Sequence, residues 1–186
     1  MIGDMIVNLY WKDLWRKQRI CDIRSIFPSD KERLLDFVKE NFPNEKGWIM
    51  EIDHALHEGK VMIAIDNHKI IGFACWDCSG KGYFGPFGVS SKCRHKGVGT
   101  ELFQSCMDAM KYYGYGYAII GWVAEKEEDD NSPLNFYKKV AGAYFIPHSS
   151  PNETIYSNKC TLNKLIERDE VYGNYDELDM HKLGYN

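Results

Sequence analysis

One segment of the sequence constrains the fold more than any other: residues 89–100, which read Val-Ser-Ser-Lys-Cys-Arg-His-Lys-Gly-Val-Gly-Thr. The segment follows a predicted strand at residues 83–89 and begins the longest amphipathic pattern, a helix predicted over residues 97–113 that ends at Gly114. Glycines let a ligand come close to the backbone, and the first N–H groups of a helix have no partner within the helix and favour negative charge. The segment therefore predicts a strand–loop–helix unit that binds a phosphate or a diphosphate.

The glycine spacing separates this loop from two common nucleotide-binding loops. A dinucleotide fingerprint would have a third glycine at position 102, where this chain has Leu102, and this disfavours a nucleotide-dependent oxidoreductase. A P-loop would end in Gly-Lys followed by Ser or Thr, whereas Lys96 here precedes Gly97. A Gly-x-Gly pair alone is a weak signal, so a turn that only shapes the start of the helix remains an alternative.

Short strands and helices alternate along the rest of the chain. Gly85-Pro86 interrupts one predicted strand, and because proline lacks a backbone donor, that strand should lie at an edge or be bulged there. Ser29 and Glu32 are spaced as a capping box for the first helix. Together the elements predict a mixed α+β domain with helices packed on a central sheet. Strands are predicted at residues 5–10, 21–27, 61–65, 69–76, 83–89 and 117–123, helices at 29–43, 45–59, 97–113 and 133–142, and a terminal hairpin at 143–147 and 154–158.

The length and charge of the chain exclude several classes of protein. A chain of 186 residues fits one domain with a sizeable core. The net charge of −4 argues against a nucleic-acid partner, which usually needs a basic surface. No apolar run approaches the roughly 20 residues that span a bilayer, and the start of the chain, with Asp4, lacks a secretory pattern. We therefore expect a cytoplasmic protein with no membrane partner.

The six cysteines are expected to be reduced and structural. Cys75-Trp76-Asp77-Cys78 has the spacing of a redox pair, but it continues a predicted strand instead of starting a helix, where the dipole would lower the thiol pKa. A zinc site would need a second such pair, which the sequence lacks. No metal site is expected.

A family resemblance joins these features. Residues 94–99, Arg-His-Lys-Gly-Val-Gly, resemble the Gln/Arg-x-x-Gly-x-Gly/Ala signature of the GNAT superfamily of N-acetyltransferases. Residues 83–89 resemble the family's fourth strand, and residues 136–143 resemble its Tyr-x-x-x-Gly-Phe element. The resemblance implies one domain over residues 21–160, with a mixed, mostly antiparallel sheet flanked by helices. Residues 1–20 would then be an N-terminal extension and residues 161–186 a C-terminal tail.

The resemblance also implies an activity: transfer of the acetyl group of acetyl-CoA to a primary amine of a small molecule, an amino sugar or a peptide, by a monomer or a homodimer. By analogy with the family, the N–H of Val89 would polarise the acetyl carbonyl, and Tyr137, a phenol of pKa about 10, would protonate the departing thiolate. The residues that would bind acetyl-CoA are Phe87, Val89, Arg94, His95, Lys96, Gly97, Val98, Gly99, Thr100 and Tyr137.

Departures from the family pattern leave the base and the acceptor pocket open. Residues 83–89 contain no acid, although many relatives place a glutamate base there, so Asp77 and Glu125 are the candidate bases. Trp76 and Trp122 are candidates to line the acceptor pocket, where an aromatic face can hold an ammonium group. The spacing from Tyr137 to Gly142 is one residue longer than is usual, and Ala143 stands where Phe is common. Without a base in the strand, a non-catalytic sensor or interaction module that binds acyl-CoA is the alternative.

Overall fold

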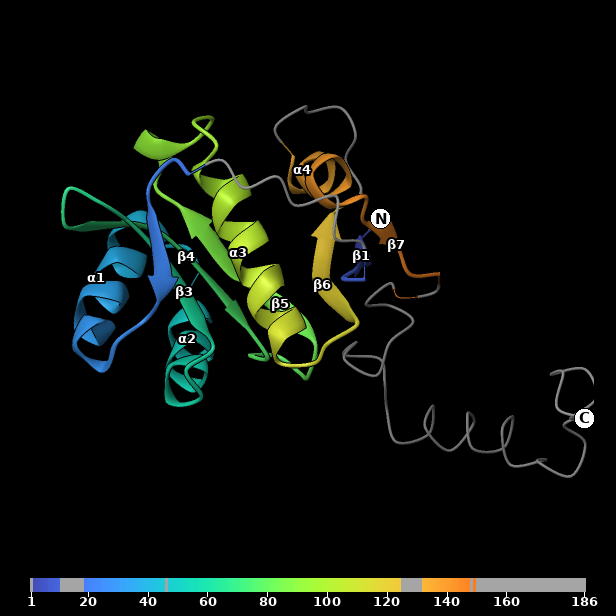
Figure 1. Ribbon diagram of the computed structural model, residues 1–186, viewed down its shortest axis with the longest axis horizontal. Helices are drawn as coiled ribbons and strands as arrows, with labels where there is room; N and C mark the ends of the chain where they lie inside the picture. Colours follow the sequence, from blue (N-terminus) through green and yellow to red (C-terminus); the bar gives the residue numbers. More distant parts are fainter. Residues whose placement is uncertain (1, 11–18, 46, 125–131, 148, 150–186) are drawn as a thin grey trace, which may run out of the picture.

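The computed structural model describes residues 2–10, 19–45, 47–124, 132–147 and 149. In this part of the chain a seven-stranded sheet has the order β2-β3-β4-β5-β6-β1-β7, and four helices pack on it (Figure 1). The predicted mixed α+β class is confirmed. The strands are β1 (Ile2–Asn8), β2 (Asp22–Ser25), β3 (Val61–Asp66), β4 (Lys69–Trp76), β5 (Tyr83–Val89), β6 (Tyr117–Ala124) and β7 (Tyr144–Phe145). The helices are α1 (Lys31–Asn41), α2 (Trp48–His57), α3 (Val98–Tyr112) and α4 (Pro133–Ala141).

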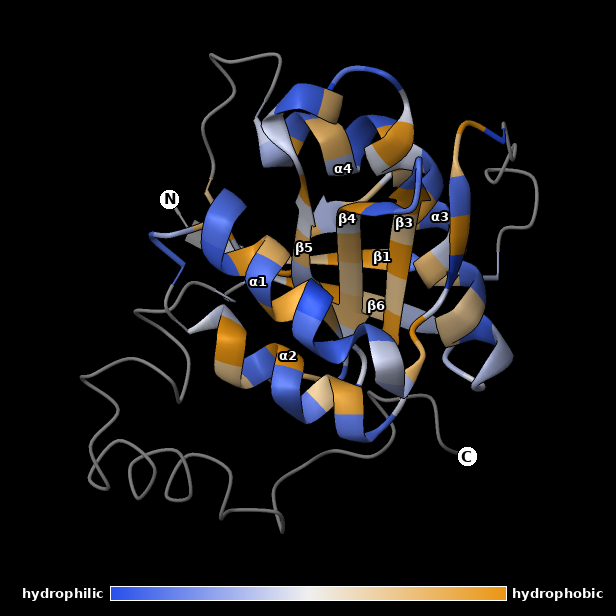
Figure 2. Ribbon diagram, turned by 90° about the vertical axis from the view of Figure 1, so that its left-hand side faces the viewer, coloured by the Kyte–Doolittle hydropathy of each residue, from blue (hydrophilic) through white to orange (hydrophobic). Residues whose placement is uncertain are grey.

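The sheet separates two apolar cores. Alternate residues of a strand point to opposite faces, and β3 shows this clearly: Val61 and Ile63 pack in one core, and Met62 and Ala64 in the other. The first core also contains the buried faces of α1 and α2, and the second contains those of α3 and α4. Figure 2 accordingly shows α1 and α2 on the side of the sheet opposite α3.

An opening in the sheet forms where β5 and β6 separate. These strands are the parallel pair of a sheet whose other pairs are antiparallel, and their pairing comprises Tyr83 with Ile119 and Phe84 with Ile120. The pairing of β5 with β4 continues to Val89 and contains a register shift between Ala74 and Trp76 of β4. Residues 85–89 therefore have a ladder on the β4 side alone. The strand is central in the sheet but behaves as an edge after Gly85, as the proline predicts.

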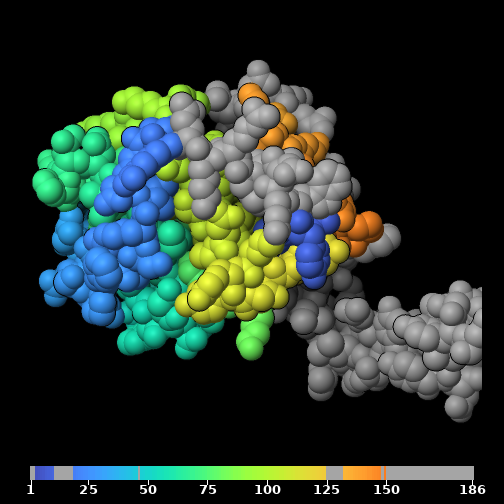
Figure 3. All heavy atoms as spheres, viewed as in Figure 1, coloured from blue at the N-terminus to red at the C-terminus, as the bar shows by residue number. Residues whose placement is uncertain are grey.

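The N-terminal strand β1 completes the half of the sheet beyond this opening. It lies between β6 and β7 and is antiparallel to both, with Met5 opposite Ile120 and Phe145. Met5, Val7 and the nearby Leu9 are buried in the core of α3 and α4. In Figure 3 the dark-blue residues of β1 lie between the yellow residues before β6 and the orange residues of β7. Part of the segment that we expected to be an extension is thus a strand of the sheet.

Two local predictions fail for identifiable reasons. Pro28 starts a short 3-10 turn (Pro28–Asp30), so α1 begins at Lys31 and Ser29 does not cap it. The Asp30 carboxylate is the buried polar group here, and it accepts hydrogen bonds from Arg24, Arg33 and the N–H of Phe27. Strand β6, expected to be fully buried, alternates instead, because α3 and α4 cover only one of its faces.

Other predictions are confirmed or lie outside the described residues. Helix α4 starts as expected, because the Ser132 hydroxyl accepts a hydrogen bond from the N–H of Asn135 at 3.2 Å, and Gly142 ends it in the left-handed conformation. The second strand of the terminal hairpin, the C-terminal tail and the acidic run 125–130 lie outside the described residues. No helix in the described part of the chain has the length and apolar character to cross a membrane.

Candidate active site

A cavity of about 1910 Å³ lies at the opening between β5 and β6. Its lining includes residues 83–89 of β5 and residues 120–122 of β6. The start of α3 and one side of α4 contribute to one end, and α2, the connection before it and β1 contribute to the other. The cavity therefore joins surfaces that belong to both faces of the sheet.

The first turn of α3, with its backbone N–H donors, lies at this cavity. Gly97 is the N-cap, with φ of 83°, and no side chain among the described residues caps the helix. Position 97 favours glycine because of its positive φ, whereas a Cβ there would meet only the movable end of the Ile20 side chain. A Cβ at Gly99 would come no closer than 3.6 Å to other atoms, so that glycine is not required for packing. Gly99 and Thr100 line the cavity beside these donors, which suits an anion.

Basic side chains surround this turn. Arg94 lines the cavity and its Nε donates to the carbonyl oxygen of Val89 at 3.2 Å, which ties the loop to the end of β5. His95 lines the cavity too, with φ of 59°. Lys138 and Lys139 of α4 also line it, although sequence reasoning did not select them. Their signal was their position directly after Tyr137 on the same short helix.

Tyr137 lies in the wall between the two ends of the cavity. Its ring packs against those of Phe84, Phe103 and Phe136, and the residue is only 8% exposed. Burial raises the pKa of Tyr137 well above its ordinary value, so the phenol is fully protonated at neutral pH. The described residues provide no hydrogen-bond acceptor for its hydroxyl, which therefore remains available to a ligand.

The other end of the cavity has one wall formed by β1, β5 and β6. Trp122 is 64% exposed and adopts φ of 60°, and its N–H donates to Asp4 Oδ1 at 3.1 Å. The Tyr83 hydroxyl donates to Asp4 Oδ2 at 3.1 Å. Gly121 has no side chain, and a Cβ there would crowd the Tyr83 ring at 3.3 Å. All these residues line the cavity.

The opposite wall at this end comes from the connection between α1 and α2 and from α2 itself. Phe42 and Trp48 pack together with ring centroids 5.1 Å apart, and the absence of a side chain at Gly88 makes room for Phe42 over β5. Glu45 and Glu51 line the cavity beside these rings. Burial, reinforced by the charge of Glu45, raises the pKa of Glu51 above its ordinary value.

The comparison with family models agrees with this geometry. The model of the Acetyltransferase (GNAT) family matches residues 18–143, more than half of the chain. The chain belongs to the GNAT acetyltransferase family. Strand β1 lies before the matched residues, although it contributes Asp4 to the cavity. No curated protein matches the sequence.

Solved structures of N-acetyltransferases and GNAT-family proteins share the fold. A GCN5-related N-acetyltransferase from Sphaerobacter thermophilus is 18% identical, with a TM-score of 0.62 over 78% of this chain and 48% of that chain. The glucosamine N-acetyltransferase region of a fungal multi-domain GH3 β-N-acetylglucosaminidase is 18% identical, with a TM-score of 0.59 over 78% of this chain and 20% of that one. A GNAT-family acetyltransferase from Colwellia psychrerythraea is 11% identical, with a TM-score of 0.57 over 78% and 53%. This chain thus spans about half or less of the length of each.

Most of the residues that the sequence predicts to bind the coenzyme line the cavity between β5 and β6. Two are not among its lining residues: the side chain of Val98 is buried in the core, and Lys96 lies outside the lining. Trp122 also lines the cavity, at the end where Asp4 lies. The expected residues that line the cavity are Phe87, Val89, Arg94, His95, Gly97, Gly99, Thr100 and Tyr137.

Asp77 does not lie in the cavity, and this corrects its assignment as a base. Its carboxylate accepts from the Tyr115 hydroxyl at 2.6 Å and the Gly82 N–H at 2.7 Å, and pairs with Lys60 at 3.0 Å. Burial alone would raise the pKa of Asp77, but these three partners outweigh it and lower the pKa. Asp77 therefore holds the turn between β4 and β5.

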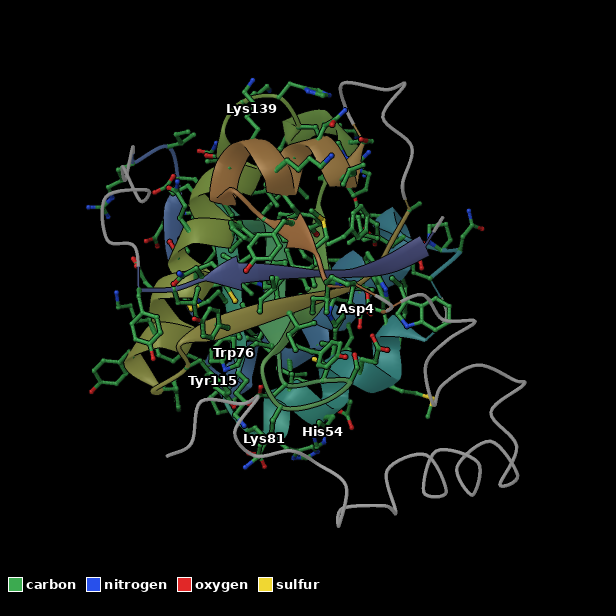
Figure 4. All side chains as sticks on the ribbon, turned by 90° about the vertical axis from the view of Figure 1, so that its right-hand side faces the viewer. Asp4, His54, Trp76, Lys81, Tyr115 and Lys139 are labelled. Atoms are coloured by element: carbon green, nitrogen blue, oxygen red, sulfur yellow. The ribbon has the colours of Figure 1, made fainter. Side chains whose placement is uncertain are left out.

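Trp76 is likewise a core residue and not a wall of the acceptor pocket. It is 1% exposed, lies outside the cavity lining and packs against Tyr113. Figure 4 shows Trp76 and Tyr115 toward one end of the molecule, Lys139 at the other end, and Asp4 between them. Glu125, the other candidate base, lies outside the described residues.

Proposed function

We propose that this acetyltransferase binds acetyl-CoA along β5 and transfers the acetyl group to a primary amine. The observation that carries the proposal is the uncapped first turn of α3 beside the opening in the sheet. A turn with free N–H groups and a separated strand edge offers partners for two different parts of the coenzyme. These parts are a diphosphate and a chain with amide groups.

The diphosphate would bind at the basic end of the cavity. First-turn N–H groups of α3 point out of the helix and favour an anion, and the side chains of Arg94, His95 and Lys139 add positive or titratable charge there. The pantetheine arm would lie along residues 85–89, whose β6 side has no ladder. Its amides can pair with that strand as an added strand would.

The acetyl group would then lie near Val89 and Tyr137, and the thioester supplies the electrophilic carbonyl. The N–H of Val89 donates a hydrogen bond to the carbonyl oxygen as it gains negative charge. The Tyr137 hydroxyl donates to the sulfur as it leaves. Because burial raises the pKa of Tyr137, complete proton transfer to the sulfur is opposed, and a hydrogen bond that stabilises the thiolate is the favoured role.

The amine must lose a proton, and Glu51 is the described carboxylate best suited to accept it. It is half-buried in the cavity wall, and its raised pKa makes it a stronger base than an ordinary glutamate. It comes from α2, so the missing acid in β5 does not leave the cavity without a base. Glu125 stays a second candidate for this role.

Two measurements on the intact chain test the proposal. Calorimetric titration with acetyl-CoA should show binding, and a thiol assay should detect CoA release when amines of different classes are added. Binding without CoA release for any amine would favour the sensor module. Failure to bind acetyl-CoA would reject the assignment of the α3 turn.

A further inference from the structure

The N-terminal strand carries a feature that the proposed function leaves unexplained. Asp4 lies on β1, outside the residues that match the GNAT family, and its backbone is held firmly. Its N–H donates to the Ser149 hydroxyl at 2.9 Å, and its carbonyl oxygen accepts from the N–H of Ile146 at 2.8 Å. The strand therefore places the Asp4 side chain at a fixed point in the cavity wall.

Within the described ranges, no cationic side chain pairs with the Asp4 carboxylate. Its two oxygens accept hydrogen bonds from the Tyr83 hydroxyl and the Trp122 N–H, both neutral donors. A carboxylate has about four acceptor positions, so it can take further donors from a ligand. A half-buried carboxylate without a counter-charge is stabilised by a bound cation.

The surroundings of Asp4 favour a cation as well. Glu45 and Glu51 line the same end of the cavity, and neither has a described ion-pair partner. Trp122, whose backbone N–H donates to Asp4, lines the same cavity and is largely exposed, and an indole ring attracts an ammonium group. The basic residues of the cavity belong to the opposite, coenzyme end, where Lys139 lies (Figure 4).

The reacting amine cannot itself use this negative charge throughout the reaction, because it must be neutral to attack the carbonyl. We propose that Asp4 binds a second, non-reacting ammonium group of the acceptor, so that the enzyme selects amines that carry an additional positive charge. This inference rests on the proposed transfer to an amine and names the acceptor class and a residue that selects it.

The test compares two acceptors of equal length, diaminobutane and butylamine. The unmodified protein should show a higher kcat/KM for diaminobutane. Asp4→Asn removes the charge but keeps one acceptor oxygen for the backbone N–H of Trp122, and its NH₂ group can donate to the Tyr83 hydroxyl. It should raise the KM for diaminobutane by about 10-fold or more, as expected for a lost charged hydrogen bond. The change for butylamine should be smaller. Asp36→Asn, an exposed carboxylate of α1 outside the cavity lining, is the matched control and should leave both values unchanged.

Three outcomes would overturn the inference. The first is that the unmodified protein has a kcat/KM for butylamine equal to or higher than that for diaminobutane. The second is that Asp4→Asn leaves the ratio of the two kcat/KM values unchanged. The third is that acetyl-CoA binds but none of the amines causes CoA release, and this outcome rejects the amine-transfer proposal as well. Asp4→Glu should recover part of the preference if charge is what matters. If Asp4→Asn does not fold, added salt gives a second readout: it should reduce the preference of the unmodified protein for diaminobutane, and an unaffected preference rejects the inference.

Discussion

The end of the cavity that we propose binds the coenzyme (the coenzyme end) is built mainly from one stretch of backbone. The end that we propose binds the amine (the acceptor end) is built from side chains of separate segments. Residues 94–100 supply the loop and the helix start at the coenzyme end. Asp4, Tyr83, Trp122 and Glu51 meet at the acceptor end from β1, β5, β6 and α2. Backbone amides bind a diphosphate whatever the neighbouring side chains are, but the choice of acceptor depends on those side chains.

Glu51→Gln should produce the largest loss of activity, and it should affect the reaction with the amine but not the binding of acetyl-CoA. Removal of a base costs between about 100- and 10,000-fold in rate, so kcat/KM for an amine should fall within that range. The Kd for acetyl-CoA should stay the same, because Glu51 lies away from the α3 turn. Folding favours the protonated form of Glu51, since burial raises its pKa, so the neutral variant should be at least as stable at neutral pH.

Steady-state rates and thermal unfolding check this, with Glu32→Gln, an exposed carboxylate on α1, as the control. A rate loss below about 10-fold would remove Glu51 as the base, since proton transfer by a placed group contributes more than that.

Gly99→Asp should weaken the binding of acetyl-CoA about as strongly as Glu51→Gln lowers activity. A negative charge about 5 Å from a diphosphate, at an effective dielectric constant of about 20, costs roughly 3 kcal/mol, so the Kd for acetyl-CoA should rise about 100-fold. Gly99→Asn adds similar bulk without charge and should weaken binding far less, because a Cβ fits at position 99. An acid in the first turn of a helix is favourable, so the melting temperature should not fall for that reason.

Calorimetry on both variants separates charge from bulk. Equal Kd values for the aspartate and asparagine variants would show that no diphosphate lies at this turn. Position 97 is unsuitable for this experiment, because any residue other than glycine strains the backbone at its φ of 83°.

The same contrast explains which parts of the site the sequence could predict. The loop of residues 94–100 is contiguous, and Gly97 and the start of α3 are local signals, so the sequence could predict the helix start and most of the lining residues at this end of the cavity. Asp77 was predicted as a candidate base because it follows a strand. Its carboxylate instead accepts a hydrogen bond from Tyr115, which is 38 residues away in the sequence. Asp4 and Glu51 were missed because nothing near them in the sequence indicates the cavity. The position of β1 between β6 and β7, which brings Asp4 to the site, follows from tertiary packing.

Tyr137→Phe tests the residue between the two ends. Loss of one hydrogen bond to a sulfur that gains negative charge should lower kcat by about 10-fold or more. The Kd for acetyl-CoA should change little, since the ring still packs against Phe84, Phe103 and Phe136. Parallel measurement of kcat and of the Kd by calorimetry checks this. A change in the Kd with kcat preserved would assign Tyr137 to coenzyme binding alone.

Asp77→Asn should have the smallest effect on activity, because Asp77 belongs to neither end. The substitution leaves Lys60 with Glu58 as its remaining ion-pair partner at 3.3 Å and weakens the contacts to Tyr115 and Gly82. The free energy of unfolding should fall by about 1–3 kcal/mol at neutral pH, with unchanged kcat. The pKa of Asp77 is lower in the folded state, so its contribution is present above the unfolded pKa of about 4 and is lost as the pH falls through the folded value. Denaturant unfolding at several pH values should therefore show the difference between the two proteins shrinking as the solution is acidified through this range. A large loss of kcat with an unchanged free energy of unfolding would instead support a role for Asp77 in catalysis.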